Sequence, residues 1–429
     1  MYIFETYLHL RQHAALKLRT LPKTLVGVIS QETFEKYRAY NIDKSNLRFV
    51  KQFVTIIIDS ATLLFGVLPR LWKKSGDIVE STGLDAENEI YQTLAFLACV
   101  MYWSQITNLP FSLYSTFVIE ERHGFNKQTF WLFIRDMLKG MTVAIVLGPP
   151  IVAAIILIVQ KSGPYLAIYL WGFIFVLSLF MMTIYPVLVP PLYNKLTPLP
   201  QGELRTKIET LASSQNFPSK KLFVVDGSTW STHSNAYLFG FSKNKCIALF
   251  DTLIQQCTNE EEIVAVIAHE LGHWKLNHKI YSSVGVQAGR VQMGFVSSHW
   301  KLDLMVNILI LLLFGGYTLV KNSNDLFTSF GFDTQPVLIE FILFQYTIIP
   351  VQHLVSFDLN LVTHAFEFQA DAFAKKLGYA KPLRDALVKM QVGNLSEMNT
   401  DPWYSVYHYS HPTLLERLAA LDEPHNKAD

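Results

Sequence analysis

The sequence predicts a polytopic α-helical membrane protein with a small α+β domain that two separate segments of the chain build together. Three observations support this fold class. Half of the 429 residues are hydrophobic and only 17% are charged, whereas average soluble chains contain roughly 25% charged residues. The apolar residues gather in blocks, and a membrane-spanning helix needs about 20 of them. Residues 193–279 and 364–429, in contrast, have the composition of soluble protein.

Five apolar segments are long enough to span a bilayer, and a sixth, Leu304–Val320, is marginal. The five are Phe53–Trp72, Leu94–Val118, Met141–Val159, Tyr165–Val189 and Val337–Leu361. Met1–Leu10 has neither the basic start nor the cleavage site of a signal peptide, and its pattern is typical of the end of an apolar helix. The excess of Lys and Arg in Arg11–Lys51 indicates that this loop faces the cytosol.

Charge and cysteine content exclude two other classes of protein. The net charge is +1, which excludes a strongly basic nucleic-acid-binding domain. We therefore expect membrane lipid, and no nucleic acid, among the partners. Cys99, Cys246 and Cys257 share no metal-ligand spacing and are too few for a disulfide framework, so we expect reduced thiols.

The first soluble segment predicts a surface helix, three strands and a second helix. In chain order these are Leu204–Gln215, Lys221–Asp226, Asn235–Phe241, Cys246–Asp251 and a helix that opens at Thr258 with a capping box to Glu261. We divide the chain into N-terminal transmembrane helices and loops (1–192), the first part of the soluble domain (193–283), a membrane hairpin (284–362) and the second part of the soluble domain (363–429).

The strongest chemical signal is the pair of histidines in His269-Glu270-Leu271-Gly272-His273. Histidines four residues apart on a helix lie on one face, so both imidazoles can bind one zinc ion. Glu270 can take a proton from a zinc-activated water and deliver it to the leaving amine. A surface helix with two incidental histidines is the alternative, but the apolar residues at 263–267 favour a buried active-site helix.

A catalytic zinc ion usually has three protein ligands, and the candidates for the third lie in His364–Lys376. Glu367 and Asp371 are four residues apart and share a helix face. One carboxylate can bind zinc while the other orients a ligating histidine through a hydrogen bond. A solvated helix with two charges is the alternative, but the Phe and Ala residues around both acids favour burial.

Five blocks of the sequence resemble the type I CAAX prenyl endopeptidases, zinc proteases that trim prenylated C-termini, and plant members most of all. The blocks are AHELGHWKLNH, FEFQADAFAKKLG, YHYSHPTLLERL, TFVIEERHGFNKQTF and SNAYLFGF. The resemblance implies a ring of transmembrane helices around a large chamber, closed at one end by the zinc protease domain. It implies one Zn²⁺ per chain, held by His269, His273 and Glu367.

The same resemblance implies roles for five further residues. Glu270 is the catalytic acid and base, Asp371 supports the zinc ligands, and Arg417 lies near the same site. His411 stabilises the oxyanion of the tetrahedral intermediate, and Asn235 belongs to an edge strand that pairs with the substrate backbone. Without the family, His411 before Pro412 is more typical of a turn, Arg417 of a surface ion pair and Asn235 of a turn cap. The block Glu120–Gly124 is typical of a charged turn at the membrane interface, and its family match assigns it no role.

The function that the resemblance implies is removal of the last three residues, aaX, from prenylated CaaX proteins. It places the protein in the endoplasmic reticulum membrane as a multi-pass protein with its catalytic domain facing the cytosol. A membrane quality-control metalloprotease, which cuts unprenylated or unfolded chains, is the alternative enzyme. A catalytically impaired member of the family is the other alternative.

Three departures from the family pattern are the reason for the last alternative, a catalytically impaired member of the family. Family members carry more apolar residues ahead of MYIFETYL, so we expect a shortened first membrane helix. Residues 288–307 have no counterpart and form an atypical insertion in the membrane hairpin. Four positions carry unusual residues: Trp230, Glu340, Asp358 and His364. Acids within a membrane span cost a few kcal/mol unless they face water or a partner.

Overall fold

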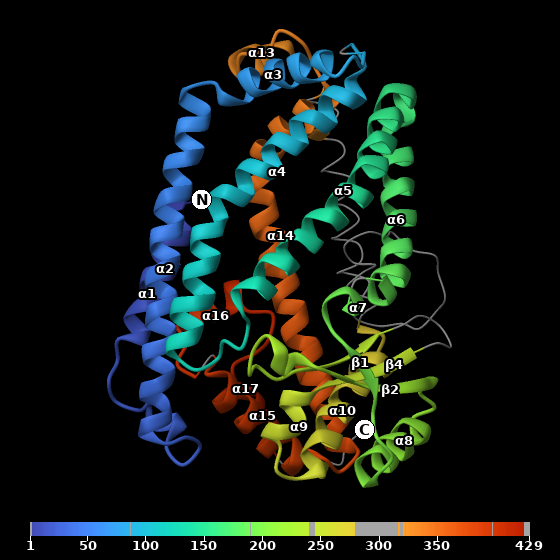
Figure 1. Ribbon diagram of the computed structural model, residues 1–429. Coiled ribbons are helices and arrows are strands. Elements are labelled where there is room, and N and C mark those ends of the chain that lie inside the picture. The colour runs from blue at the N-terminus through green and yellow to red at the C-terminus, as the bar shows by residue number, and fades with distance from the viewer. Residues whose placement is uncertain are drawn as a thin grey trace.

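The computed structural model places long helices above a smaller α+β region (Figure 1). It describes residues 2–85, 87–188, 190–239, 245–278, 316–317, 321, 323–396 and 398–423. The predicted insertion at 288–307 and most of the marginal span Leu304–Val320 lie outside these residues. The helices α3 (Val67–Ser81) and α13 (Asn324–Ser329) cover the upper end in Figure 1, and the sheet lies at the lower end.

The N-terminal half is built from long helices joined by short turns. They are α1 (Tyr2–Leu16), α2 (Gln31–Leu64), α3, α4 (Glu89–Tyr114) with its π-helical continuation η2 (Ser115–Glu120), α5 (Phe130–Lys161) and α6 (Leu166–Leu188). Their starts follow the expected capping chemistry. Ser30, Asn88 and Thr129 each accept a backbone N–H of the first helical turn through the side-chain oxygen.

The predicted span Phe53–Trp72 is bent, because its residues belong to two helices. The helices α2 and α3 meet at an angle of 72° at the break between them. Gly66 lies in this break with φ of 55°, a left-handed conformation that ends a helix and that glycine adopts without steric cost. The apolar run therefore ends α2 and then turns into α3 across the upper end.

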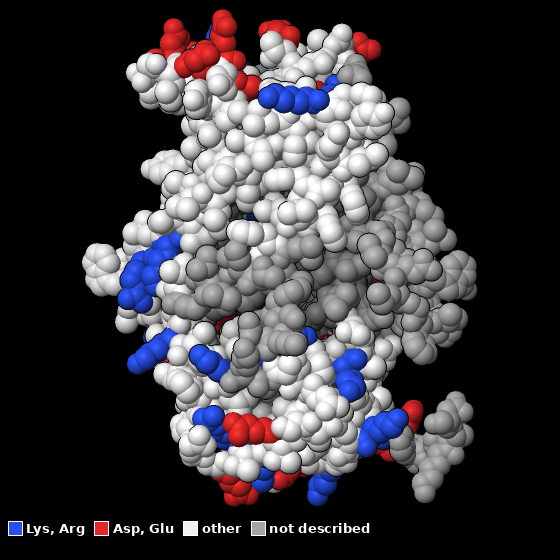
Figure 2. Space-filling view, turned by 90° about the vertical axis from the view of Figure 1, so that its right-hand side faces the viewer, with Lys and Arg blue, Asp and Glu red and all other residues white. Residues whose placement is uncertain are grey.

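Two of the described helices, α5 and α14 (Val337–Lys376), have the length and composition to cross a membrane, or three segments if the bent pair α2–α3 counts as one. They contain the predicted spans Met141–Val159 and Val337–Leu361, and α4 and α6 overlap two others. On the face shown in Figure 2, charged side chains gather at the upper end and over the lower half, and the described residues just below the upper end form a band nearly free of Lys, Arg, Asp and Glu, as in a membrane belt.

The α+β region contains a four-stranded sheet. Its strands are β1 (Leu196–Pro198), β2 (Ser219–Val225), β3 (Ala236–Phe239) and β4 (Lys245–Phe250). The order is β1-β2-β4-β3, with β2 and β4 parallel and the other pairs antiparallel, so β3 is an outer strand of the described sheet. The three predicted strands are confirmed, and the predicted surface helix is α8 (Glu203–Ser214).

The helix with the two histidines is α10 (Glu260–Lys275), and it packs against β3 and α8. Its predicted N-cap is wrong by one residue. The Asn259 side chain accepts the Glu261 N–H at 3.0 Å, while Thr258 Oγ1 accepts from Lys389 Nζ instead. Residues 263–268 of α10 are buried in the largest hydrophobic core, as the apolar pattern predicts.

Short helices complete the molecule around α10 and α14. They are α7 (Pro190–Tyr193), α9 (Asp251–Gln256), α15 (Ala380–Asn394), α16 (Pro402–His408) and α17 (Leu414–Asp422). The long helix α14 runs from the upper end of the molecule down to the α+β region (Figure 1). Its C-terminal part packs on α10, α15 and α17, so one helix joins the membrane part to the metal-binding histidines.

Three of the four unusual residues have specific partners. Trp230 Nε1 donates to Asp136 Oδ2 at 2.6 Å, and buried Glu340 accepts from the Tyr317 hydroxyl at 2.7 Å. His364 Nε2 donates to the Tyr409 carbonyl at 2.9 Å. Because each polar group finds a partner, these departures from the family pattern fit the fold.

The close packing of α10 on α14 yields a first prediction. A Cβ at Gly272 would lie 3.1 Å from Ala370 Cα and 3.2 Å from Ala370 O, backbone atoms that cannot rotate away. Gly272→Ala should therefore destabilise the protein by about 1–3 kcal/mol through overpacking, more than the roughly 1 kcal/mol gained in helix propensity. Thermal unfolding in detergent measures the effect. Gly172→Ala, whose Cβ meets no atom within 4 Å, is the control, and equal melting temperatures for both variants would contradict the prediction.

Candidate metal centre

Three side chains from α10 and α14 converge on one point. His269 Nε2 and His273 Nε2 are 3.1 Å apart. Glu367 lies opposite, with Oε1 3.2 Å from His273 Nε2 and Oε2 3.5 Å from His269 Nε2. The i, i+4 spacing puts both imidazoles on one face of α10, and the packing of α14 brings Glu367 to that face. The structure thus groups the three residues that the sequence predicts as ligands.

The two imidazole nitrogens and the two oxygens of the Glu367 carboxylate have spacings close to those of the ligands of one tetrahedral metal ion. Bonds of about 2.0–2.2 Å to nitrogen and oxygen place neighbouring ligand atoms roughly 3.4 Å apart in a tetrahedron. The observed separations range from 3.1 to 3.5 Å. Glu367 Oε2 is also buried, and its partners among the described residues are the ion pairs with Arg417 NH1 at 3.3 Å and His269 Nε2 at 3.5 Å. Both contacts are longer than a strong charged hydrogen bond, and a metal ion would satisfy this oxygen more fully.

Asp371 and Arg417 support the metal-binding side chains through hydrogen bonds and ion pairs. Asp371 Oδ1 lies 2.8 Å from His269 Nδ1 and accepts its proton, so the lone pair of Nε2 points toward the centre. The Arg417 guanidinium donates to both Asp371 oxygens, from Nε at 2.8 Å and from NH2 at 2.7 Å. Its NH1 lies 3.3 Å from Glu367 Oε2. Arg417 is therefore buried in the centre and is not part of a surface ion pair.

The electrostatics of the centre favour a bound cation. The carboxylates of Glu270, Glu367 and Asp371 all interact with the single Arg417 guanidinium, so the centre has an excess of negative charge. Burial opposes the charged form of His269, yet its hydrogen bonds to Asp371 and Glu367 raise its pKa to about 9. A proton on His269 offsets part of the negative charge of the three carboxylates. A divalent metal ion would offset more of it.

His411 and Glu270 lie beside the three convergent residues. His411 Nε2 is 3.4 Å from Glu367 Oε1, and 59% of its side chain is exposed. The hydrogen bond of His364 to the Tyr409 carbonyl ties the segment before His411 to α14. Glu270 directly follows His269 and is only partly buried. Both residues can therefore reach a substrate at the centre.

Asn235 has a different place from the other predicted residues. It directly precedes β3, and its hydrogen bonds are made with the backbone of the sheet. Its Oδ1 accepts the Ala236 N–H at 2.8 Å, and its carbonyl accepts the Phe250 N–H at 3.0 Å. The side chain thus orders the first residue of the outer strand β3.

The sequence reasoning missed His278 and Gln369. Gln369 Oε1 accepts from His278 Nε2 at 3.1 Å, which leaves His278 Nδ1 to accept the His273 Nδ1 proton at 2.9 Å. Burial lowers the pKa of His278 to about 4 and keeps it neutral for this role. The chain of bonds turns the lone pair of His273 Nε2 toward the centre. In the sequence, the signal for this supporting role was His278 itself, a third histidine five residues after His273.

A second group of possible ligands, Glu5, His9 and His408, occurs among the described residues. It is less suited to a metal ion. The rings of His9 and His408 are nearly parallel, at 15°, so their in-plane lone pairs do not converge. The Arg48 guanidinium also lies 3.5 Å from His9 Nδ1 and adds positive charge.

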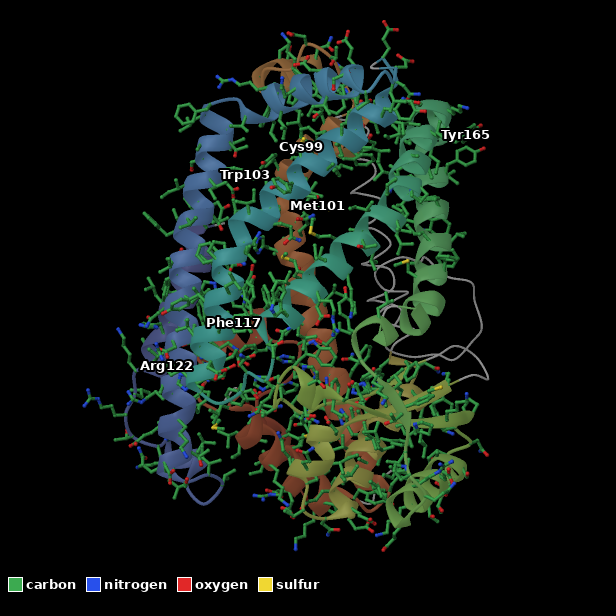
Figure 3. The ribbon with its side chains drawn as sticks, viewed as in Figure 1. Cys99, Met101, Trp103, Phe117, Arg122 and Tyr165 are labelled. Carbon is green, nitrogen blue, oxygen red and sulfur yellow. The ribbon has the colours of Figure 1, made fainter. Side chains whose placement is uncertain are left out.

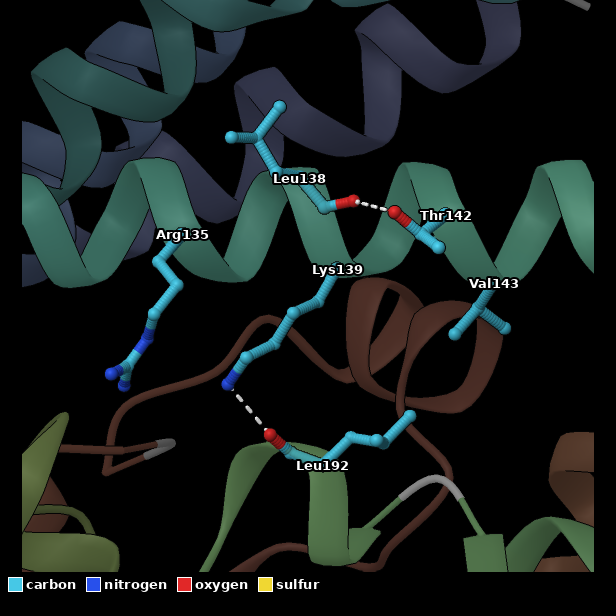
Figure 4. A pocket seen from close by; sticks show the side chains of 6 residues that line it. All are labelled: Arg135, Leu138, Lys139, Thr142, Val143 and Leu192. Atoms are coloured by element: carbon cyan, nitrogen blue, oxygen red, sulfur yellow. Dashed lines mark hydrogen bonds between the residues drawn. The ribbon is translucent and has the colours of Figure 1, made fainter.

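A separate cavity of about 300 Å³ lies on α5 beside Leu192 (Figure 4). Arg135, Leu138, Lys139, Thr142, Val143 and Leu192 line it. Lys139 Nζ donates to the Leu192 carbonyl at 2.6 Å, so this cation already has a partner. None of the metal-binding residues lines this cavity, so the geometry of the centre, and not this cavity, marks the site of chemistry.

Comparison with known proteins identifies the family. Residues 198–425 match the description "Peptidase family M48", and residues 11–195 match "CAAX prenyl protease N-terminal, five membrane helices". The chain belongs to peptidase family M48. It is therefore an enzyme, a metalloprotease with a metal cofactor, and a multi-pass membrane protein, as the sequence predicts.

Individual M48 relatives extend the similarity over nearly the whole chain. The "CAAX prenyl protease 1 homolog" of Arabidopsis thaliana is 70% identical over 100% of this chain and 96% of its own. The rice protein of the same name is 67% identical over the same shares. The crystal structure of S. mikatae Ste24p superposes with a TM-score of 0.87 at 36% identity, covering 98% of this chain and 96% of that chain. The predicted resemblance and fold class are confirmed.

The support of His269 by Asp371 yields a second prediction. Asp371→Asn keeps the size of the side chain but removes the charge that fixes the His269 proton and pairs with Arg417. Metal affinity should fall about 10–100-fold, as for other residues that orient metal ligands. Chelator competition followed by metal analysis measures it. Asp358→Asn on the same helix, outside the centre, is the matched control, and unchanged affinity in Asp371→Asn would refute the role.

The chain from Gln369 through His278 yields a third prediction. His278→Phe keeps the ring that stacks on Phe366 at 4.2 Å but removes the acceptor for the His273 proton. The variant should fold normally and release its metal to a chelator at least about tenfold faster. Retention equal to that of the unchanged protein would show that His273 needs no such acceptor.

Proposed function

We propose that this protein is a zinc endopeptidase that removes the C-terminal aaX tripeptide from prenylated CaaX proteins. One observation carries the proposal: a convergent His269–His273–Glu367 group with Glu270 beside it, at the lower end of a membrane-helix assembly. The names of the relatives, CAAX prenyl protease 1 homologs, support the substrate class.

Zinc is the metal that best suits this donor set. Two imidazole nitrogens and one carboxylate oxygen with a fourth position open are the ligands of a typical catalytic zinc site. His269, His273 and Glu367 would hold the ion. Bound there, zinc polarises a carbonyl and acidifies a bound water molecule.

The residues of the chain supply the proton transfers and the charge stabilisation. Glu270, partly exposed and next to His269, accepts the proton of the attacking water and later donates it to the leaving amine. His411 reaches over Glu367 Oε1 and donates a hydrogen bond to the oxyanion that develops on the scissile carbonyl. Asp371 and Arg417 keep His269 and Glu367 in place throughout the reaction.

The substrate peptide would bind along β3. This strand is outermost in the described sheet and packs on α10, so an extended peptide added to it passes the face that carries His269 and Glu270. Addition of a strand provides backbone hydrogen bonds that do not depend on the substrate side chains. Asn235, which orders Ala236 at the start of β3, would fix where this pairing begins.

We further propose that the protein lies in the endoplasmic reticulum membrane with its α+β region in the cytosol. The Lys and Arg excess of Arg11–Lys51 supports this orientation. Prenylated CaaX proteins are exposed to the cytosol and carry their lipid at the cysteine that precedes the scissile bond. An active site at the end of a membrane-helix assembly suits such a substrate, and lipid around the belt in Figure 2 is the other partner.

Peptide cleavage tests this proposal. The purified protein should release the tripeptide from a farnesylated CaaX peptide, whereas Glu270→Ala should lose activity by at least about 10³-fold and keep its zinc. His273→Ala should lose both zinc and activity. Mass spectrometry of the products and metal analysis of each variant give the two measurements.

An unprenylated peptide of the same sequence is the control. Equal cleavage of both peptides would favour the quality-control protease, and no cleavage by a zinc-loaded protein would favour a catalytically impaired member of the family. Activity that survives in His273→Ala would remove the assignment of the metal centre itself.

A further inference from the structure

The block Glu120–Gly124, to which the sequence assigned no role, begins where the continuous helix α4–η2 ends. Figure 3 shows Phe117 and Arg122 at the lower end of this helix, away from Cys99 and Trp103. We call residues 120–127 the clamp loop. We call residues 230–234, which directly precede Asn235 and β3, the lead-in segment.

The clamp loop is fixed to the membrane helix α2. The Tyr40 hydroxyl donates to Glu120 Oε1 at 2.6 Å. Arg122 NH1 and His123 Nε2 both contact Asp43 Oδ2, at 2.8 and 3.0 Å. These three contacts join the loop to the N-terminal half of α2.

The other side of the clamp loop pairs with the backbone of the lead-in segment. Asn126 and Ser231 form an antiparallel bridge. The two flanking hydrogen bonds run from Lys127 N–H to the Trp230 carbonyl at 3.1 Å and from Thr232 N–H to the Phe125 carbonyl at 3.2 Å. Pairing of this kind sets the register of the lead-in segment, because a shift by one residue would break both bonds.

His233 adds a side-chain contact that suits a tight connection. Its ring stacks on Phe125, with centroids 4.4 Å apart and planes at 15°. Its Nε2 lies 3.5 Å from Glu120 Oε2, a buried oxygen with no hydrogen-bond donor among the described residues. The Trp230 indole, three residues earlier, donates to Asp136 of α5. The lead-in segment thus contacts the membrane helix α5 as well as the clamp loop.

The α+β region holds the same segment from the opposite side. Gln256 Nε2 donates to the Thr232 carbonyl at 3.0 Å, and Thr252 Oγ1 donates to the His233 carbonyl at 2.9 Å. Ser234 N–H donates to Asn394 Oδ1 at 2.9 Å. The lead-in segment is therefore the place where the membrane helices and the α+β region are joined immediately before β3.

We propose that the clamp loop, through Phe125 and Glu120 on His233, positions β3 relative to the membrane helices and thereby selects the peptide bond that is cut. This inference rests on the proposed function. A prenylated peptide is held at two points, with its lipid among membrane helices and its backbone along β3. The scissile bond reaches the metal centre only if these two points keep a fixed separation, and the clamp loop is the contact that fixes it.

His233→Ala tests the role of the clamp. The variant should keep its metal and raise KM for the farnesylated peptide by about tenfold with kcat changed less than about threefold, the pattern of lost uniform binding of the peptide along β3. Mass spectrometry should also find cleavage at neighbouring bonds. His13→Ala, which removes a histidine bonded to Ser45 between α1 and α2, is the control and should leave KM and cleavage position unchanged.

Two further variants separate the contacts of His233. His233→Phe keeps the stacking on Phe125 and removes the approach to Glu120, whereas Glu120→Gln keeps an acceptor for Tyr40 and removes the charge. If positioning depends on both contacts, each variant should show part of the KM effect of His233→Ala. Wild-type KM and cleavage position in all three variants would overturn the proposal.

A designed disulfide tests whether the connection itself matters. Asn126 and Ser231 face each other without mutual backbone hydrogen bonds, a pair type with Cα atoms about 4.5 Å apart, within the range of disulfides. Asn126→Cys with Ser231→Cys in the His233→Ala background should restore KM and cleavage position when oxidised and lose them again on reduction. Oxidation without any rescue would contradict the proposal.

Amide hydrogen exchange tests the clamp loop by a measurement that does not require catalytic activity. Amides of β3 should exchange at least about tenfold faster in His233→Ala than in the unchanged protein or His13→Ala. If the unchanged protein cleaves no CaaX peptide, the proposed function fails while this measurement still tests the clamp. Equal exchange at β3 in His233→Ala would overturn the clamp whatever the activity.

Discussion

The structure depends on one electrostatic constraint, the placement of three carboxylates, two of them buried and one partly buried, beside a single buried guanidinium. Glu367, Asp371 and Glu270 share Arg417 as their cation, and buried charges are tolerated only when they are paired. This constraint requires α10, α14 and α17 to pack together. The three carboxylates come from α10 and α14 and the guanidinium from α17, so these charges pair only where the three helices meet. It also leaves negative charge that a divalent ion neutralises. The fold of the α+β region and its affinity for metal therefore have the same physical origin.

The helix α14 extends this constraint to the membrane. Its N-terminal part has the composition of a membrane span, and its C-terminal part carries Glu367 and Asp371. A metal centre on such a helix has a fixed height relative to the bilayer. The clamp loop gives β3 a second connection to the membrane helices through His233. The proposed catalytic groups and the proposed substrate-binding strand β3 are thus both connected to membrane helices, which would suit a substrate that is itself anchored by a lipid.

Local patterns in the sequence predicted most of the centre, and long-range packing determined the rest. His269 and His273 follow from helix periodicity alone, whereas the spacing of Glu367 and Asp371 indicated only a pair of candidate carboxylates, and the family resemblance chose Glu367 as the ligand. Arg417 resembles a surface residue until α17 packs on α14, and His278 acquires its role only through Gln369, 91 residues away. The break at Gly66 was missed because an apolar run does not reveal a change of direction. Of the departures from the family pattern, Trp230, Glu340 and His364 find partners that no local rule anticipates.

The central claim is that a single zinc ion completes the charge balance of this centre through two imidazoles and one carboxylate. X-ray absorption at the zinc edge, combined with metal analysis of the purified full chain, tests it most directly. The account predicts one zinc per chain with nitrogen and oxygen neighbours at about 2.0–2.2 Å and no sulfur. Sulfur neighbours at about 2.3 Å would assign the metal to cysteines instead. A folded chain that binds no zinc would contradict the claim that the buried carboxylates require it.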